Sequence, residues 1–187
     1  KTGAENCVLA GGVALNVVAT GKLLKEGPFE SIWIQPAAGD AGGALGAALW
    51  VWHHVLGNPR ASNRGDSMRA ALLGPDIPPR SKAHDQVLES LGGVWETLSD
   101  DKLQRRMATL VAEGKVIGLA RGRMEWGPRA LGARSVLGDA RSPGMQSHMN
   151  LAIKFREGFR PFAPIVLKED SSDYFDMEVD SPYMLLT

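Results

Sequence analysis

The sequence predicts an α/β fold in two parts, on three observations. Short apolar runs typical of buried strands alternate with stretches whose apolar residues recur at helical spacing. A stretch rich in Gly, Pro, Asn and Asp, from residue 57 to residue 79, interrupts this alternation. The composition is 44% hydrophobic and 22% charged, which is typical of a globular chain with a core and excludes a disordered one. We therefore expect two domains, 1–74 and 75–187.

The first part has the pattern strand, helix, strand, helix. Apolar runs predict strands over 7–10 and 31–35, and periodic apolar residues predict helices over 13–26 and 41–56. A strand–helix–strand unit of this length joins two parallel strands by a right-handed crossover. The second helix is rich in Ala and Gly, which favours close packing against the sheet.

The second part mixes helices, strands and one long loop. We expect, in order, a helix over 100–113, a strand over 116–120, a loop over 121–134, a strand segment over 135–137, a helical run over 144–155 and a strand over 165–167.

Composition excludes several classes of protein. Lys plus Arg and Asp plus Glu each number 21, so the chain as a whole gives no support for binding nucleic acid or a membrane surface. The single cysteine, Cys7, excludes an internal disulfide framework and a cysteine-based zinc cluster. No apolar stretch approaches the roughly 20 residues that span a bilayer, and no secretory leader is visible. A cytoplasmic setting is expected. Because the chain opens at Lys1 on a strand pattern, we also expect a fragment of a longer protein.

Charge is segregated within the second part. Residues 115–160 carry nine Lys or Arg against three acids, whereas residues 169–180 carry six acids and no base. This pattern indicates a local anion site beside an acidic surface. The alternative is ordinary surface charge.

Two glycine-rich loops follow the two predicted strands of the first part. Glycine between a strand and a helix lets the backbone approach a ligand closely, and the exposed N–H groups attract phosphate. Turn chemistry alone is the alternative, but two such loops on adjacent parallel strands favour nucleotide binding. Asn16 either hydrogen-bonds a nucleotide or makes a local contact at the helix start. The candidate nucleotide-binding residues are Gly11, Gly12, Asn16, Gly39, Gly42 and Gly43.

Asp40 is the one acid at the mouth of these loops. It is either a helix N-cap or a ligand for a metal or a ribose. The His53–His54 pair does not supply partner ligands, because adjacent helix positions point about 100° apart. We expect both histidines to be surface or packing residues.

The loop over 121–134 carries four arginines interrupted by glycines and a proline, so it is no regular helix. Arginine is suited to planar, bidentate binding of phosphate and carboxylate. Glu125 would orient one arginine or cap a turn, and Trp126 would form an apolar wall or a stacking face. The alternative is a solvated loop with internal ion pairs. The candidate anion-binding residues here are Arg121, Arg123, Arg129, Arg134 and Ser135.

A second basic element follows. In an extended Lys154–Phe155–Arg156 segment, Lys154 and Arg156 would face the same side, and Arg160 comes shortly after. Alternatively, Lys154 and Arg156 protect an edge strand. We call Arg121, Arg123, Arg129, Arg134, Lys154, Arg156 and Arg160 the cation set.

Both halves resemble one family. The segments 10–16 and 39–48 are similar to the second nucleotide-binding half of a TsaD-like domain, in the superfamily of actin, heat-shock ATPases and sugar kinases. Together with 124–135 and 150–164, they resemble the NodU/TobZ-type O-carbamoyltransferases, whose carboxyl-terminal domain is YrdC-like. The resemblance implies a partial actin-like (TsaD-like) ATPase subdomain followed by a YrdC-like α/β domain. It is weakest from 58 to 99.

The resemblance also implies a two-step activity. Carbamoyl phosphate and ATP would form a carbamoyl adenylate, and the carbamoyl group would pass to a hydroxyl of a small molecule or oligosaccharide. The cation set and Ser135 would bind carbamoyl phosphate and ATP, and the glycine loops would hold the adenylate. Asp40 would bind a divalent metal, Fe or Mg, with ligands from an upstream half that this chain lacks. We expect the isolated fragment to be inactive. The acceptor and the oligomeric state, a homodimer included, stay open.

Three alternatives use the same residues. One is a threonylcarbamoyl-type tRNA-modifying enzyme, although the second part is not basic overall. Another is a non-catalytic nucleotide-binding module. The third is an RNA-binding module built on 121–134, which has only Trp126 for base stacking.

Overall fold

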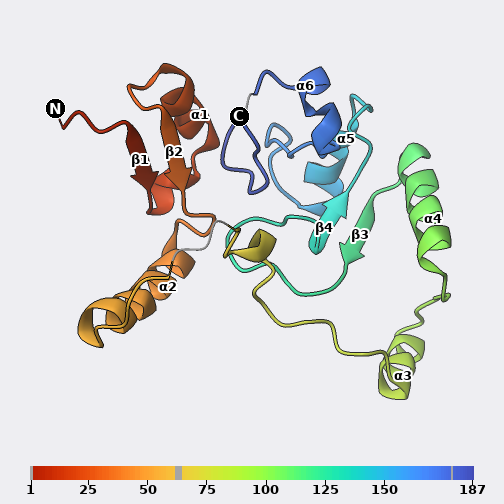
Figure 1. Cartoon of the computed structure of the whole chain (residues 1–187). Helices are drawn as coiled ribbons and strands as arrows, with labels where there is room; N and C mark the ends of the chain where they lie inside the picture. Colours follow the sequence, from red (N-terminus) through yellow and green to blue (C-terminus); the bar gives the residue numbers. More distant parts are fainter. Residues whose placement is uncertain (1, 62–64, 178) are drawn as a thin grey trace. The chain divides into compact units, whose positions relative to one another are not determined.

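The computed structural model describes residues 2–61, 65–177 and 179–187 and is a mixed α/β protein with small sheets (Figure 1). The α/β class predicted from the sequence is confirmed. The chain forms two compact units, each made of segments that are distant in sequence: the first unit is Lys1–Pro75, Arg123–Ala133 and Ile165–Thr187, and the second is Asp76–Gly122 and Arg134–Pro164. The boundary expected after residue 74 stays a prediction.

The first unit contains the predicted parallel strand pair. Strand β1 (Asn6–Leu9) pairs with β2 (Ser31–Ile34), with Cys7 opposite Ile32. The connection between them is the short 3-10 helix η1 (Gly12–Leu15) and the helix α1 (Val17–Glu26). The helix predicted over 13–26 is therefore divided at Asn16.

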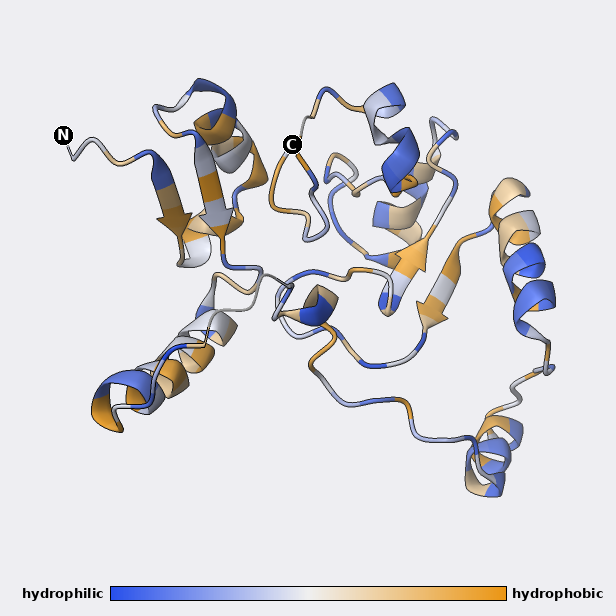
Figure 2. Ribbon diagram, viewed as in Figure 1, coloured by the Kyte–Doolittle hydropathy of each residue, from blue (hydrophilic) through white to orange (hydrophobic). Residues whose placement is uncertain are grey.

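The glycine- and alanine-rich helix α2 (Asp40–Trp50) continues as a π-helical turn, η2 (Val51–Val55), and together they cover the predicted 41–56. Neither contains a buried residue, and Figure 2 shows apolar residues along the whole element. The expected close packing of this helix against the sheet is therefore not observed among the described residues. His54 stacks on Trp50 with ring centroids 4.0 Å apart, and His53 Nδ1 lies 2.9 Å from Asn58 O, which confirms local packing roles for both histidines.

The core of the first unit includes the end of the chain. Ala14, Ile34, Ala38 and Leu185 are buried together. The Thr20 hydroxyl donates a 2.6 Å hydrogen bond to Leu185 O. The C-terminal segment is thus part of the structure that supports β1, β2 and the helix between them.

A tight turn at residues 66–71 lies near the end of the segment Lys1–Pro75 of this unit. Asp66 Oδ1 accepts a hydrogen bond from Met68 N at 3.0 Å, and its Oδ2 accepts from Ala70 N at 2.8 Å and from the Tyr183 hydroxyl. The turn η3 (Arg69–Ala71) has φ values of 50°, 53° and 62°, a left-handed conformation that costs free energy for residues with a Cβ. The Asp66 carboxylate holds the backbone in this conformation.

The second unit has an antiparallel pair in which β3 (Ile117–Ala120) lies against β4 (Arg134–Leu137). The other elements are α3 (Lys82–Ser90), α4 (Asp100–Ala112), α5 (Met145–His148) and the π-helical η4 (Met149–Ile153). All of these except α3 were predicted, with ends that differ by a few residues.

The strand predicted over 165–167 is wrong. Ile165 and Leu167 are exposed and pair with no strand in the described part of the chain, which continues into the short helices η5 (Lys168–Asp170) and α6 (Ser171–Tyr174). A local apolar run resembles a strand whether or not a partner strand exists. Within the described residues, every helix is too short or too polar to cross a bilayer.

Replacement of Tyr183 by Phe tests the contact between the chain end and the turn. Burial, with the hydrogen bond to Asp66, raises the pKa of Tyr183 to about 12. An unfolded phenol titrates near pH 10, so the stability that this phenol contributes is complete below pH 10 and is lost as pH rises through about 12. We expect Tyr183→Phe to lower the free energy of unfolding by about 1 kcal/mol at pH 8 and by less at pH 11, measured by urea denaturation.

Tyr174→Phe is the matched control, because Tyr174 is exposed. It should change stability little at either pH. A Tyr183→Phe effect that is the same at pH 8 and pH 11 would contradict the assignment.

Candidate functional site

The two glycine loops lie side by side because β1 and β2 are parallel neighbours. Gly11 N donates a 2.7 Å hydrogen bond to Ala38 O, which joins the loop after β1 to the loop after β2. Gly11 has φ of 98°, a conformation that glycine adopts without strain. The expected adjacency of the loops at the carboxyl ends of the strands is confirmed.

The glycines in these loops have different surroundings. A Cβ at Gly42 would lie 2.1 Å from Ala37 O, so this glycine allows the first turn of α2 to pack on the preceding loop. A Cβ at Gly39 would contact the Leu15 side chain at 3.7 Å. At Gly12 and Gly43 a Cβ would meet nothing within 4 Å. Gly12 and Gly43 therefore leave open space beside the backbone, as a close-fitting ligand needs.

Asn16 makes the helix-start contact that sequence analysis gave as one of its two roles. Its Oδ1 accepts a 3.2 Å hydrogen bond from Ala19 N and caps α1. This contact explains why the helical pattern is interrupted there, since the N-cap residue itself has an extended conformation. Binding of a nucleotide by its amide N–H groups stays a prediction.

Asp40 is exposed and is the first residue of α2, whose N-cap is Gly39. The N-cap interpretation of Asp40 is therefore wrong. Among the residues that the structure describes, no three His, Cys, Asp or Glu side chains gather into a metal-binding group. A single exposed carboxylate does not fit Mg²⁺ or Fe²⁺ without further ligands, so we assign no reaction step to a metal.

The arginine-rich loop is divided between the two units. Its residues Arg123–Ala133 belong to the first unit, where the Arg129 Nη2 donates a 2.8 Å hydrogen bond to Leu15 O. Glu125 is 8% exposed, and its Oε1 accepts from Leu131 N at 2.8 Å and Ala133 N at 2.6 Å. The turn-capping role expected as one alternative for Glu125 is confirmed.

Other members of the cation set bind backbone carbonyls. Arg123 Nη2 donates to Leu73 O at 3.2 Å in the first unit. In the second unit, Arg134 donates to Arg121 O at 2.9 Å and Gly122 O at 3.2 Å. These hydrogen bonds lie at the end of the β3–β4 pair where the connecting loop begins. Ser135 lies in β4 opposite Leu119.

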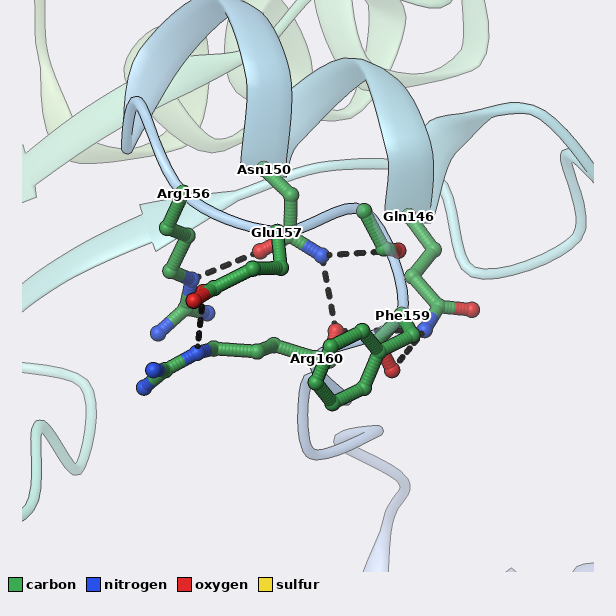
Figure 3. A network of polar contacts seen from close by, with 7 residues as sticks. Gln146, Asn150, Arg156, Glu157, Phe159 and Arg160 are labelled. Atoms are coloured by element: carbon green, nitrogen blue, oxygen red, sulfur yellow. Dashed lines mark hydrogen bonds and ion pairs between the residues drawn. The ribbon is translucent and has the colours of Figure 1, made fainter.

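Asn150 is the centre of a polar network in the second unit (Figure 3). It is fully buried, and its Nδ2 donates to Gly158 O at 3.2 Å and Arg160 O at 2.7 Å. Its Oδ1 accepts a 2.6 Å hydrogen bond from Arg156 Nε. Asn150 is a residue whose role the sequence patterns do not predict, although one amide within the apolar run 149–153 is a signal for it.

The rest of the network fixes the basic segment 156–160. Gln146 Nε2 donates to Phe159 O and Arg160 O, at 3.2 and 3.1 Å. Arg160 Nε lies 2.8 Å from Glu157 Oε2. A dashed line marks this ion pair in Figure 3. A hydrogen bond from its own backbone N–H, together with the Arg160 guanidinium, lowers the pKa of Glu157. Glu157 is therefore ionised at neutral pH and neutralises part of the charge of Arg160.

Arg156 is held on two sides. Besides the bond to Asn150, its guanidinium lies 4.9 Å from the centre of the Phe162 ring. Its charge helps to lower the pKa of the nearby Glu157, but no ion pair within 4 Å joins it to a carboxylate among the described residues. Arg156 thus presents a fixed cation that a phosphate could bind.

Lys154 does not share an extended segment with Arg156. Lys154 ends η4 in a helical conformation, and Phe155 has φ of 48°. The argument that alternation places both cations on one side is therefore wrong, because the chain bends between them. The exposed Lys154 remains a predicted anion ligand on charge alone.

A hollow of about 240 Å³ in the first unit lies apart from the cation set. Trp33, Asp66, Met68 and Tyr183 are among the residues that line it, and no member of the cation set does.

Family models of carbamoyltransferases match two parts of the chain. The family model for the carbamoyltransferase N-terminus matches residues 1–49, and the model for the carbamoyltransferase C-terminus matches residues 108–187. The glycine loops lie in the first match. The arginine loop and the Asn150 network lie in the second.

Curated relatives align along nearly the whole chain. The uncharacterized protein sll1178 of Synechocystis is 53% identical over 100% of this chain and 30% of its own length. Nodulation protein NolNO of Sinorhizobium fredii is 44% identical over 94% of this chain and 25% of its own. Nodulation protein U of Rhizobium tropici is 35% identical over 98% and 29%. The chain spans less than a third of each of these proteins.

Alanine substitutions at Gly42 and Gly43 test the packing of the second loop. Gly42→Ala forces a Cβ against the Ala37 carbonyl, and we expect a loss of about 1–3 kcal/mol in the free energy of unfolding. Gly43→Ala, in the same helix but in open space, should be neutral or should stabilise by up to about 1 kcal/mol. Equal effects in denaturant unfolding would show that the Gly42 contact does not constrain the loop.

Substitution of Asn150 tests the polar network. Asn150→Ala removes both donors to the 158–160 backbone and releases Arg156, so we expect a loss of about 2–3 kcal/mol. Gln146→Ala removes a donor to the same segment from an exposed position and should cost less than about 1 kcal/mol. Thermal unfolding of the two variants gives the comparison, and a Gln146 effect as large as that of Asn150 would refute the central role of Asn150.

Proposed function

Because the chain belongs to the carbamoyltransferase family, we propose that it is part of a longer, ATP-dependent O-carbamoyltransferase. Two observations support this proposal: the family's N-terminal and C-terminal models both match, and the chain spans 25–30% of the relatives described above. We further propose that residues 1–74 are part of a TsaD-like domain of the longer protein and that residues 75–187 have a YrdC-like fold.

The proposed reaction has two steps. Carbamoyl phosphate, ATP and water give carbamoyl adenylate, phosphate and pyrophosphate. The carbamoyl group then passes to an acceptor hydroxyl on a small molecule or oligosaccharide, and AMP leaves. Both donors are polyanions, so the enzyme must hold them together against their mutual repulsion, and fixed cations can do this.

The fixed guanidinium of Arg156 is the observation that carries the assignment of the first step. Asn150 and Phe162 orient it, which leaves its terminal N–H groups for bidentate contact with a phosphate. An arginine that is oriented in advance loses less entropy on binding than a free one. Arg121, Arg134, Lys154 and Arg160 are the further donor ligands that we propose in the second unit.

The glycine loops of the first unit are assigned to the adenylate. Gly12 and Gly43 leave space beside the backbone, and the loops follow adjacent parallel strands. This is the position at which parallel sheets bind phosphorylated ligands. We propose that the rest of the parent protein supplies the acceptor site and any metal ligands that would join Asp40.

The full-length protein should form labelled carbamoyl adenylate from labelled carbamoyl phosphate and ATP. We expect Arg156→Gln to lower the rate of carbamoyl adenylate formation at least tenfold, because a bidentate contact with phosphate is lost. Arg141→Gln is the matched control, since Arg141 is exposed and paired with Asp139, and its rate should stay within twofold of the unsubstituted protein. Product would be followed by chromatography.

Absence of product with any divalent metal would remove the enzyme proposal. A folded Arg156→Gln protein with an unchanged rate would return Arg156 to a structural role. The isolated 187-residue chain should not transfer the carbamoyl group to an acceptor, because its glycine loops form only part of a nucleotide cleft.

A further inference from the structure

Arg129 has a buried guanidinium N–H that no acceptor among the described residues satisfies. It is half-buried, and its only hydrogen bond among the described residues is the one from Nη2 to Leu15 O. Its Nε is buried without a hydrogen-bond partner. An N–H of a guanidinium that has lost its water and gained no acceptor is costly.

The positive charge of Arg129 also lacks a counter-ion. In the part of the chain that the structure describes, no carboxylate lies within 4 Å of this guanidinium, whereas Arg80, Arg141 and Arg160 each have an acidic partner. The Leu15 carbonyl supplies only a partial negative charge. A bound anion would provide both the missing charge and further hydrogen-bond acceptors.

The surrounding backbone fixes where this cation lies. Gly127 has φ of 138°, and a Cβ there would lie 3.4 Å from the Ala37 side chain, so the loop is seated on the turn after β2. Glu125 caps the other side of the same loop. Leu15, which binds Arg129, ends the 3-10 helix that begins at Gly12. Arg129 is therefore in contact with the segment that follows the first glycine loop and close in sequence to a residue seated on the second.

We propose that Arg129 binds the phosphate of a nucleotide at the glycine loops of the first unit. This inference rests on the proposed function and changes one of its assignments, because Arg129 leaves the set of carbamoyl-phosphate ligands. The segment matched by the carbamoyltransferase C-terminus model then supplies a cation to the loops matched by the N-terminus model. The phosphate is the expected ligand because open glycine backbone at the ends of parallel strands admits it at short range.

The test compares AMP with adenosine, which differ by the phosphate alone. Binding of each to the full-length protein is measured by isothermal titration calorimetry. We expect Arg129→Gln to raise the Kd for AMP at least tenfold and to leave the Kd for adenosine within twofold of its value in the unsubstituted protein. Arg129→Lys keeps the charge but loses the planar guanidinium, so its Kd for AMP should lie between those of the unsubstituted protein and Arg129→Gln.

Arg60→Gln is the matched control, because Arg60 is an exposed arginine of the same unit whose side chain has one hydrogen bond among the described residues, to His54 at 3.4 Å. It should leave the affinity for AMP unchanged. Adenosine binding reports in every variant that the loops are still folded.

Three results would overturn the proposal. They are AMP affinity within twofold of the unsubstituted protein in Arg129→Gln, an equal loss for AMP and adenosine, and unsubstituted protein that prefers adenosine or binds neither. This outcome is separate from that of the carbamoyl adenylate assay, since the titrations need neither carbamoyl phosphate nor turnover. Formation of carbamoyl adenylate without an Arg129 effect on AMP would leave the proposed function and remove only this inference.

Discussion

The parallel pairing of β1 with β2 is the constraint on which the glycine-loop site depends. Parallel neighbours end at the same edge of a sheet, so the loops that follow them must lie together. The hydrogen bond from Gly11 N to Ala38 O joins the two loops directly. Gly42 then allows α2 to begin immediately against the second loop, because no side chain separates its backbone from Ala37 O. A small number of backbone contacts thus sets the space beside Gly12 and Gly43.

Segments from the second half of the sequence complete this unit. Leu185 enters its core, and Arg129 and Gly127 contact residues near the two loops. Each such contact closes a loop of more than 80 residues, and the entropy cost of closing a loop rises only slowly with its length. Hydrophobic burial around Ala14 and Ile34 can therefore offset it. In this unit, residues from the segment matched by the carbamoyltransferase C-terminus model therefore contact the loops in the segment matched by the N-terminus model.

Local pattern was enough to predict most elements and too little to predict their partners. Apolar periodicity placed β1, β2, α4 and β3 because each is defined by its own sequence. It failed at 165–167, where an apolar run has no partner strand, and at Lys154, where a positive φ at Phe155 bends the chain. The candidate residues themselves were visible as glycine and arginine clusters. Their division between two units was not, because it depends on contacts such as Arg129 with Leu15 that span 114 positions.

Asn150 and Arg129 show how buried polarity separates support from binding. Asn150 uses both amide hydrogens and its carbonyl oxygen in hydrogen bonds within the second unit, so its hydrogen-bonding groups are satisfied without a ligand. Arg129 leaves a buried Nε and a whole positive charge uncompensated by the described residues. A fold has no reason to retain such a group for stability, because a neutral side chain at that position would avoid the desolvation cost. Arg123, Arg129 and Arg134 lie close together in the sequence, yet their side chains make different hydrogen bonds, and only that of Arg129 has a buried N–H without an acceptor among the described residues. These contacts, more than the spacing of the arginines, suggest different roles for them.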